Sequence, residues 1–334
     1  MTVEDLGEHA LLARILARLP RPSPTVLVGP GDDAAVLAPI RNERLVVTTD
    51  AIVEGVHFTR AYSAPADIGH KALAVNLSDL AAMGATPRWA LLSLVLPGSW
   101  LVGDVEELVD GLAALALRHR VSIVGGNITR TDGSLVVDVT AGGDVAPRRW
   151  LSRGGAKAGQ DIWVSGTLGA AAAGLEMLAD DGTRHEALGT SCVARYRRPE
   201  PRVRLGTAIG RARAASAAMD LSDGLADALR QVAAASGVGV RIDADALPID
   251  PEARAWWAAT GVDPIRAALE GGDDYELLLT APARNGRLRS ARRHAAEPPL
   301  TKIGVVTKDP GSRVLVRGGK EESLPEGFEH FAHR

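Results

Sequence analysis

Carboxylate side chains recur in this sequence within stretches of small and apolar residues. Five such stretches stand out: Gly31-Asp32-Asp33-Ala34-Ala35, Thr48-Thr49-Asp50-Ala51-Ile52, Asn76-Leu77-Ser78-Asp79-Leu80, Met219-Asp220-Leu221-Ser222-Asp223-Gly224 and Gly271-Gly272-Asp273-Asp274-Tyr275. A charged group with apolar neighbours tends to be partly buried, and an unpaired buried carboxylate is costly. Each of these aspartates must therefore meet a cation, cap a helix or take up a proton.

Basic residues are scarce beside these stretches. Lys71, Arg130 and Arg153 are the nearest along the sequence. Several carboxylates that converge with few basic partners suit a hard divalent cation, and Mg²⁺ takes oxygen ligands from carboxylates and substrate phosphates. Neighbouring threonine and serine hydroxyls could add oxygen ligands. We therefore predict a magnesium site at a cleft where these stretches meet.

Local structure offers an alternative interpretation for most stretches. An aspartate that follows a glycine can form an Asx turn. Asp50 is expected at the end of a strand, and Ser222 or Asp223 could be the N-cap of the helix that follows. Asp79 is expected inside a helix, where capping does not explain it. The recurrence of the pattern five times favours the metal interpretation.

The segment Gly125-Gly126-Asn127 follows a predicted strand directly. A glycine pair at a strand end lets the backbone approach a ligand closely, and a tight turn is the alternative. The sequence contains neither G-x-x-x-x-G-K-[ST] nor a G-x-G-x-x-G that opens a helix after a strand. A bound phosphate would then be held through metal ions. His57 lies seven residues after Asp50, and both a structural and a functional role stay open for it.

Apolar periodicity predicts alternating helices and strands. The expected helices span 6–19, 67–82, 105–119, 168–179, 200–212 and 223–236. The expected strands span 34–37, 45–49, 91–96, 121–124, 135–141, 161–165, 238–243, 275–280, 302–306 and 313–317. A change of composition at 147–160 predicts a domain boundary near 147. The alternation indicates a mixed α and β class.

The overall composition indicates a soluble globular protein. The 334 residues favour two domains, and 46% are apolar and 24% charged. A net charge of −3, from 38 basic and 41 acidic residues, argues against nucleic-acid binding. The basic stretch 284–293 is interpreted as a solvated helix face. The single cysteine, Cys192, is interpreted as a structural thiol. With an acidic start and no apolar stretch long enough to span a bilayer, we expect a cytoplasmic protein.

Taken in order, these stretches resemble the thiamine-monophosphate kinase family, within the aminoimidazole ribonucleotide synthetase-like superfamily of ATP-binding enzymes. The longest matching segment is Lys71-Ala72-Leu73-Ala74-Val75-Asn76-Leu77-Ser78-Asp79-Leu80-Ala81-Ala82-Met83-Gly84-Ala85. The others are Gly29-Pro30-Gly31-Asp32-Asp33-Ala34-Ala35, Thr48-Thr49-Asp50, Val56-His57-Phe58, Gly125-Gly126-Asn127, Leu151-Ser152-Arg153, Met219-Asp220-Leu221-Ser222-Asp223-Gly224-Leu225, Gly271-Gly272-Asp273-Asp274-Tyr275-Glu276-Leu277 and Gly327-Phe328-Glu329-His330-Phe331.

The resemblance implies the two-domain fold of that superfamily. An N-terminal α/β domain, 1–146, would bind ATP and metal and pair with its copy in a homodimer. A C-terminal α+β domain, 147–334, would close the cleft. The implied reaction is in-line transfer of the γ-phosphoryl group of ATP to thiamine monophosphate with Mg²⁺, which gives thiamine diphosphate. A potassium requirement is left open, and neither a nucleic acid nor a membrane is an expected partner.

The resemblance also carries over site residues. Its metal ligands fall on Asp33, Thr48, Thr49, Asp50, Asp79, Asp220 and Asp223, with Asn127 at one metal site. Its nucleotide contacts fall on Gly126, Asn127, Arg153 and Ser222. Its thiamine-phosphate contacts fall on His57, Asp273 and Phe328. Among these, Asp50, Asp79, Asp220 and Arg153 are expected to carry the phosphoryl transfer.

Two positions depart from the family pattern. Many members have aspartate where this chain has Asn127, so one metal site is expected to be weaker. Glutamate is common where this chain has Asp273, and the shorter side chain changes its reach toward the thiamine end. Phe328 stands where other aromatic residues also occur, so stacking is expected to survive.

Other functions remain as alternatives. Selenophosphate synthetase needs a reactive cysteine or selenocysteine near the N-terminus, whereas the cysteine here is Cys192. The hydrogenase-maturation relative carries a C-terminal cysteine, and this chain ends Phe331-Ala332-His333-Arg334. Purine-synthesis members use the same ATP geometry on another substrate, and their signatures are not found. A non-catalytic nucleotide-binding protein on the same scaffold is the alternative from a different functional class.

Overall fold

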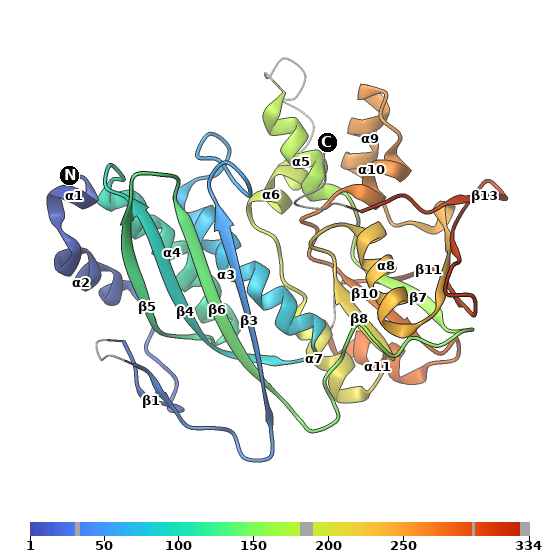
Figure 1. Ribbon diagram of the computed structural model, residues 1–334, viewed down its shortest axis with the longest axis horizontal. Coiled ribbons are helices and arrows are strands. Elements are labelled where there is room, and N and C mark those ends of the chain that lie inside the picture. Colours follow the sequence, from blue (N-terminus) through green and yellow to red (C-terminus); the bar gives the residue numbers. More distant parts are fainter. Residues whose placement is uncertain (31–33, 181–189, 296–297, 328–334) are drawn as a thin grey trace. The chain divides into compact units, whose positions relative to one another are not determined.

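The computed structural model of the chain describes residues 1–30, 34–180, 190–295 and 298–327. It divides into two compact units, each of which combines sheet and helix (Figure 1). Unit 1 comprises Met1–Leu80 and Thr86–Pro147, and unit 2 comprises Ala81–Ala85 and Arg148–Arg334.

Four long strands and two long helices form the main body of unit 1 in the described residues. The elements in chain order are α1 (Val3–Leu6), α2 (Glu8–Arg18), β1 (Val26–Val28), β2 (Val36–Leu37), β3 (Arg44–Val53), α3 (Pro65–Ala82), β4 (Thr86–Pro97), α4 (Val102–His119), β5 (Ser122–Thr131) and β6 (Val136–Val145). The strand order is β3-β6-β4-β5, in which β4 and β5 are parallel and the other pairs antiparallel. Strands β1 and β2 form a separate antiparallel ribbon.

The two faces of this sheet differ in character. Helices α3 and α4 lie on one face (Figure 1), and buried residues such as Leu92, Leu94 and Val139 point to that side. Because side chains alternate along a strand and paired residues share a face, residues such as Val47, Thr49, Leu91, Asp138 and Thr140 point to the other side. We call this second side the open face.

Helices α3 and α4 pack closely because glycines remove side chains at their crossing. A Cβ atom on Gly69 would lie 1.8 Å from the carbonyl oxygen of Leu108. A Cβ atom on Gly111 would lie 1.9 Å from the carbonyl oxygen of Ala66. The backbones therefore touch, and this contact fixes α3 against α4.

Unit 2 is built on a mixed sheet of seven strands within the described residues. The strand order is β13-β12-β9-β11-β7-β10-β8, in which β12 and β9 are parallel. The strands are β7 (Asp161–Ser165), β8 (Ala217–Asp220), β9 (Gly239–Asp243), β10 (Leu277–Ala281), β11 (Leu300–Thr307), β12 (Arg313–Arg317) and β13 (Lys320–Ser323). The helices are α5 (Ala170–Ala179), α6 (Thr190–Arg197), α7 (Val203–Ala212), α8 (Leu225–Ser236), α9 (Pro251–Thr260), α10 (Pro264–Glu270) and α11 (Gly286–Ala295), with a 3₁₀ turn at Ala244–Ala246.

The core of unit 2 joins helix α8 to the sheet. Leu229 and Val232 of α8 belong to one buried cluster with Ile242, Leu278 and Ile303 from three strands. The strand β10 is buried along its whole length. This packing holds the ends of β8 and β10 in place.

Several expected strand ends are wrong. The strand expected at 91–96 begins at Thr86, and the strand expected at 135–141 continues to Val145. Two further errors concern site residues. The strands expected at 45–49 and 121–124 continue to Val53 and Thr131, so Asp50 and the segment Gly125-Gly126-Asn127 lie inside strands. The reason is pairing: β6 continues opposite β3, and β4 continues beside β5. Gly126 is required by close packing, since a Cβ atom there would lie 1.8 Å from the carbonyl oxygen of Leu92.

Helices α9 and α10 were not expected from apolar periodicity. Each begins at an Asp-Pro pair, and Asp250 accepts hydrogen bonds from the amides of Glu252 and Ala253. Asp263 accepts a hydrogen bond from the amide of Ile265 in the same way. Capping aspartates followed by proline are a start signal that was present in the sequence.

No helix in the described parts of the chain combines the length and the apolarity that a bilayer crossing requires.

The glycine contact between α3 and α4 gives a stability prediction. Gly111→Ala should lower the free energy of unfolding by about 1–3 kcal/mol, because the added methyl group forces the two backbones apart. Urea unfolding followed by circular dichroism measures this change. Gly103→Ala on the same helix is the control, since no described atom beyond its chain neighbours and the backbone of its own helix lies within 4 Å of its Cβ position. Equal stabilities of the two variants would contradict the proposed contact.

Candidate functional site

Thr48 and Asp79 are brought together in unit 1. The alternation of β3 directs Thr48 and Asp50 to the side of α3, because they pair with the buried residues Ala141 and Val139. Asp79 lies in the last part of α3, and the hydroxyl of Thr48 donates to its Oδ2 over 2.5 Å. Within the described residues, Asp79 forms no salt bridge. The hydroxyl of Thr48 and the carboxylate of Asp79 are oxygen ligands of the kind that suit a hard cation.

A second polar group lies on the open face. The hydroxyl of Thr49 is 3.2 Å from Oδ1 of Asp138 and 3.0 Å from the hydroxyl of Thr140. Ser93 pairs with both Asp138 and Asn127, so these three residues form one row across β6, β4 and β5. The metal residues expected in unit 1 are thus divided between the two faces of the sheet.

Asp138 is not among the site residues predicted from the sequence. It occupies a strand of valines, Val136-Val137-Asp138-Val139, where a lone carboxylate is unusual. That contrast was the signal that could have identified it. Like Asp79, Asp138 has no salt bridge within the part of the chain that the structure describes.

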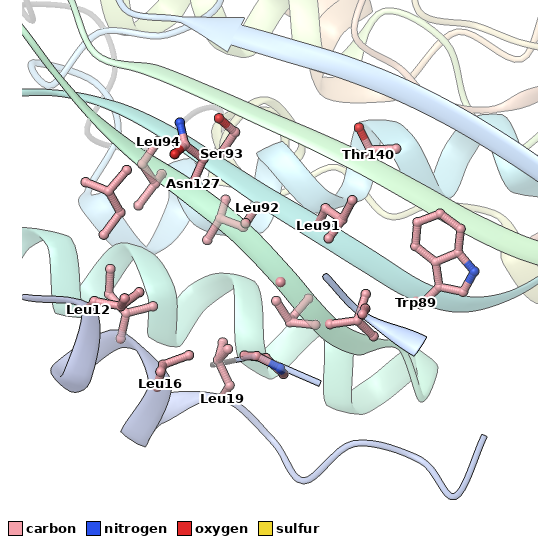
Figure 2. A pocket seen from close by; sticks show the side chains of 18 of the residues that line it. Leu12, Leu16, Leu19, Trp89, Leu91, Leu92, Ser93, Leu94, Asn127 and Thr140 are labelled. Carbon is pink, nitrogen blue, oxygen red and sulfur yellow. The ribbon is translucent and has the colours of Figure 1, made fainter. Parts of the chain in front are cut away.

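A cavity of about 920 Å³ adjoins the open-face row in unit 1 (Figure 2). Leu12 and Leu16 of α2, together with its C-cap Leu19, form an apolar wall. The polar lining comes from the strands and includes Ser93, Asn127, Asp138 and Thr140. Gly126 also lines the cavity, so two of the expected nucleotide contacts lie in one concave site of a size typical for small ligands.

His57 lies in the turn after β3. Its Nδ1 atom accepts a hydrogen bond from the amide of Val53 over 3.0 Å, which assigns the proton of a neutral ring to Nε2. Its carbonyl oxygen accepts a hydrogen bond from Nζ of the buried Lys71 over 3.2 Å. The ring therefore has a structural role in this turn, and its expected contact with thiamine phosphate stays a prediction.

The expected residues of unit 2 lie on two adjacent segments. Asp220 ends β8 and pairs with Leu277 of β10. Beyond this pair, the amide of Asp273 donates to the carbonyl oxygen of Ser222 over 2.7 Å, and the amide of Tyr275 donates to that of Leu221 over 3.0 Å. The segments 220–224 and 271–276 are therefore held side by side by backbone hydrogen bonds.

Neither Ser222 nor Asp223 is the N-cap of α8, so that alternative is wrong. The N-cap is Gly224, and it makes no side-chain capping bond. Gly224 has a φ of 91°, and a Cβ atom there would lie 2.9 Å from the carbonyl oxygen of Gly271. Only glycine suits this position, so the start of α8 is set by Gly224 and not by the side chains of Ser222 or Asp223.

Arg153 lies beside α8. Its Nη1 atom donates to Oε1 of Gln231 over 2.5 Å, and Nε2 of Gln231 donates to Oδ2 of Asp227 over 2.5 Å. Arg153 is exposed to solvent. Helix α8 begins at Leu225, after Ser222, Asp223 and the N-cap Gly224. The exposed guanidinium of Arg153 therefore lies beside the helix that follows Ser222 and Asp223.

Asp274 is a buried carboxylate that caps α5 from a distant segment. Its Oδ2 accepts a hydrogen bond from the amide of Gly169, the N-cap of α5, over 2.6 Å. Burial raises the pKa of Asp274 to about 7, although the Gly169 amide and the charge of Arg195 each act to lower it. Asp274 belongs to one of the five carboxylate stretches of the sequence, and no role was predicted for it.

Cys192 fits the structural interpretation. Its side chain is buried, and its Sγ lies 3.8 Å from Oδ1 of Asp250. Burial, together with the negative charge of Asp250, raises the pKa of this thiol to about 12. At neutral pH it is therefore protonated and a poor nucleophile.

Two expected site residues, Asp33 and Phe328, lie outside the described residues. Among the residues that are described, no group of three His, Cys, Asp or Glu side chains is close enough to hold a metal ion. The complete metal site thus stays a prediction.

The raised pKa of Asp274 gives a pH-dependent prediction. The neutral form is favoured in the folded state, so this residue stabilises the fold at low pH and loses that contribution as the pH rises toward 7. The stability of the wild type relative to Asp274→Asn should fall by up to about 1.4 kcal/mol per pH unit between roughly pH 4 and 7, then level off. Urea unfolding of both proteins at several pH values measures this difference. A difference that stays constant or grows with pH would mean that Asp274 is ionised throughout.

The family described as AIR synthase related protein, N-terminal domain, matches residues 31–145, and its C-terminal domain counterpart matches residues 157–317. The thiamine-monophosphate kinase of Escherichia coli K12 is 39% identical over 335 residues, which cover 98% of each chain.

Two solved structures agree with these matches. The thiamine-monophosphate kinase of Stenotrophomonas maltophilia K279a is 43% identical with a TM-score of 0.79, over 91% of this chain and 95% of that one. A structure described as AaThiL complexed with AMPPCP and TMP is 34% identical with a TM-score of 0.76, over 99% of each chain. The expected fold class is thereby confirmed. The chain belongs to the thiamine-monophosphate kinase family, among the proteins related to AIR synthase.

Proposed function

We propose that this chain is a kinase that transfers the γ-phosphoryl group of ATP to thiamine monophosphate and releases ADP and thiamine diphosphate. The observation that carries this proposal is the likeness to AaThiL complexed with AMPPCP and TMP, which extends over 99% of both chains. At this identity over the full length, the two chains share one fold. The carboxylate stretches of the sequence give this chain groups suited to phosphoryl transfer.

Magnesium is the metal that the donor atoms suit best. Thr48, Asp50 and Asp79 offer oxygen atoms on the α3 side of the sheet, and Asp79 has no salt bridge within the described residues. We assign these residues, together with Asp33, Thr49, Asn127, Asp220 and Asp223, as those that would hold Mg²⁺. Because Thr49 and Asn127 lie on the other face of the sheet from Thr48 and Asp50, these residues would hold more than one ion. Bound there, the ions would neutralise phosphate charge and polarise the transferred group.

The side chains would contribute positioning and charge. The phosphate of thiamine monophosphate is its own nucleophile and is largely deprotonated near neutral pH, so no side chain has to act as a base. Arg153, held by Gln231, would supply a fixed positive charge to ATP. The cavity lined by Gly126 and Asn127 would accept the nucleotide, and Ser222 would contact it. His57, Asp273 and Phe328 would contact thiamine phosphate.

We further propose that two copies of the chain associate through the open face of unit 1. Leu45, Val47 and Leu91 are 63%, 52% and 36% exposed, and all three belong to strands of the four-stranded sheet. Exposed apolar side chains on one sheet face favour burial against a partner. A second copy would supply a matching apolar face, as expected for a symmetric dimer.

Two finer assignments complete the proposal. We place the enzyme in the cytoplasm, because its reaction uses ATP and its buried thiol suits a reducing compartment. A potassium requirement is decided by measuring the rate with potassium or sodium salts at equal ionic strength.

The activity is tested by incubating the protein with ATP, Mg²⁺ and thiamine monophosphate. The expected products are ADP and thiamine diphosphate in equal amounts, separated by chromatography. Thiamine, selenide and formylglycinamidine ribonucleotide serve as alternative acceptors in parallel reactions. ADP formed only with one of these alternatives would assign a different reaction. Nucleotide binding without turnover would favour a non-catalytic protein.

Replacement of Asp79 tests the metal assignment. Asp79→Asn should lower kcat/KM on the order of 100-fold, because an amide removes the charge that attracts the cation. The shape is kept, so the free energy of unfolding should change little. Asp67→Asn, at the other end of α3, is the matched control and should keep most of the activity. A normal rate for Asp79→Asn across a magnesium titration would refute the assignment.

The dimer is tested by a charge on the open face. The wild type should sediment at twice the chain mass of 34.9 kDa, and Val47→Glu should shift it toward the monomer because a buried unpaired charge is costly. Leu117→Glu is the control, since Leu117 is 67% exposed on α4. A wild-type protein that sediments as a monomer at micromolar concentration would contradict this surface assignment.

A further inference from the structure

Glu276 is a fully buried acid with two guanidinium partners in unit 2. Its side chain is 0% exposed. Nη2 of Arg195 lies 2.8 Å from its Oε1, and Nε of Arg202 lies 2.7 Å from its Oε2. The hydroxyl of Ser165 donates to Oε2 over 2.5 Å. Both carboxylate oxygens are therefore satisfied, and none of these four residues has a role in the proposed reaction.

The backbone of Glu276 joins the two segments that carry the expected site residues. Its carbonyl oxygen accepts a hydrogen bond from the amide of Leu221 over 2.9 Å. The next amide, that of Leu277, donates to the hydroxyl of Ser165 over 2.8 Å, and Leu277 pairs with Asp220. Anchoring the Glu276 side chain therefore also fixes the end of β8.

Asp273 depends on the same anchor. Nη2 of Arg195, which binds Glu276, also donates to the carbonyl oxygen of Asp274 over 3.1 Å. The hydroxyl of Tyr275 donates to Oδ1 of Asp273 over 3.0 Å. Asp273 and Tyr275 have φ values of 66° and 50°, and non-glycine residues keep such conformations only where their surroundings hold them.

We propose that Glu276, held by Arg195 and Arg202, is a positioning residue that sets the spacing between Asp273 and the segment 220–223. This inference rests on the proposed function, in which Asp273 contacts the thiamine end and Asp220, Ser222 and Asp223 serve the phosphates. Glu276 touches neither substrate. It keeps two groups of contacts in register, which matters because misplacement by about 1 Å can cost a reaction on the order of 100-fold.

Kinetics distinguish positioning from simple structural support. Glu276→Gln should lower kcat per folded molecule at least roughly 10-fold. The KM for ATP should change little, because each group of contacts remains present while their alignment is lost. Arg202→Lys keeps the charge but not the two-point contact of the guanidinium with Glu276. It should fold well and show a smaller loss in the same parameter, so the proposal stays testable even if Glu276→Gln folds poorly.

Asp161→Asn is the matched control. Asp161 is also a buried carboxylate with one cation, since Nζ of Lys302 lies 2.6 Å from its Oδ1. It pairs with Ala281 at the far end of β10. This variant should lower Tm and leave kcat per folded molecule unchanged. Equal losses of kcat in the control and in Glu276→Gln would show that Glu276 acts only on stability.

Amide hydrogen exchange gives a readout that needs no activity. Peptides that cover 219–224 and 271–277 should exchange faster in Glu276→Gln than in the wild type or in Asp161→Asn. Unchanged exchange, or unchanged kcat in an active enzyme, would overturn the positioning role. An inactive wild type with faster exchange in the variant would contradict the proposed function and leave the anchoring of the two segments standing.

Discussion

Negative charge that is taken out of bulk water must be compensated or neutralised by a proton, and this requirement organises both units of the chain. Burial raises the pKa of Asp274 to about 7, so its neutral form is favoured below that pH, and the amides of Gly169 and Ala171 donate to it. Glu276 is compensated by Arg195 and Arg202. Asp79 receives a hydroxyl from Thr48 but no salt bridge within the described residues. Because the carboxylate of Asp79 has no salt bridge within the described residues, its charge can be compensated by a bound metal cation.

Buried acids support a strained segment in unit 2. Asp274 and Glu276 alternate with Asp273 and Tyr275, which take left-handed backbone conformations. The hydrogen bonds of the two buried acids make them fixed points of the chain, and fixed points can hold a strained segment between them. Rigid support of this kind lets short side chains present their oxygen atoms in a defined direction, which is what recognition of a phosphorylated substrate requires.

Much of this organisation was readable from the sequence, because it is local. The embedded carboxylates, the helix that contains Asp79 and the alternation of helix and strand were all visible in composition and period. The lengths of β3 and β5 were not visible in the sequence. A strand ends where its paired strand ends, and the paired strands are distant in the sequence. Asp138 escaped notice for a similar reason: its meaning comes from the row it shares with Ser93 and Asn127. Arg195 and Arg202 look like surface cations until the fold directs them to Glu276.

The departure at Asn127 changes less than the side chain alone suggests. An asparagine removes one negative charge from the edge of the sheet, yet its row on the open face also contains the carboxylate of Asp138. Thr49 donates toward that carboxylate, so a hydroxyl, an amide and a carboxylate occupy the same face. Oxygen donors for a hard cation are thus spread over three strands rather than concentrated in one residue. The loss of one negative charge at Asn127 therefore weakens the attraction for a cation at this face, while the oxygen donors of Thr49 and Asp138 remain.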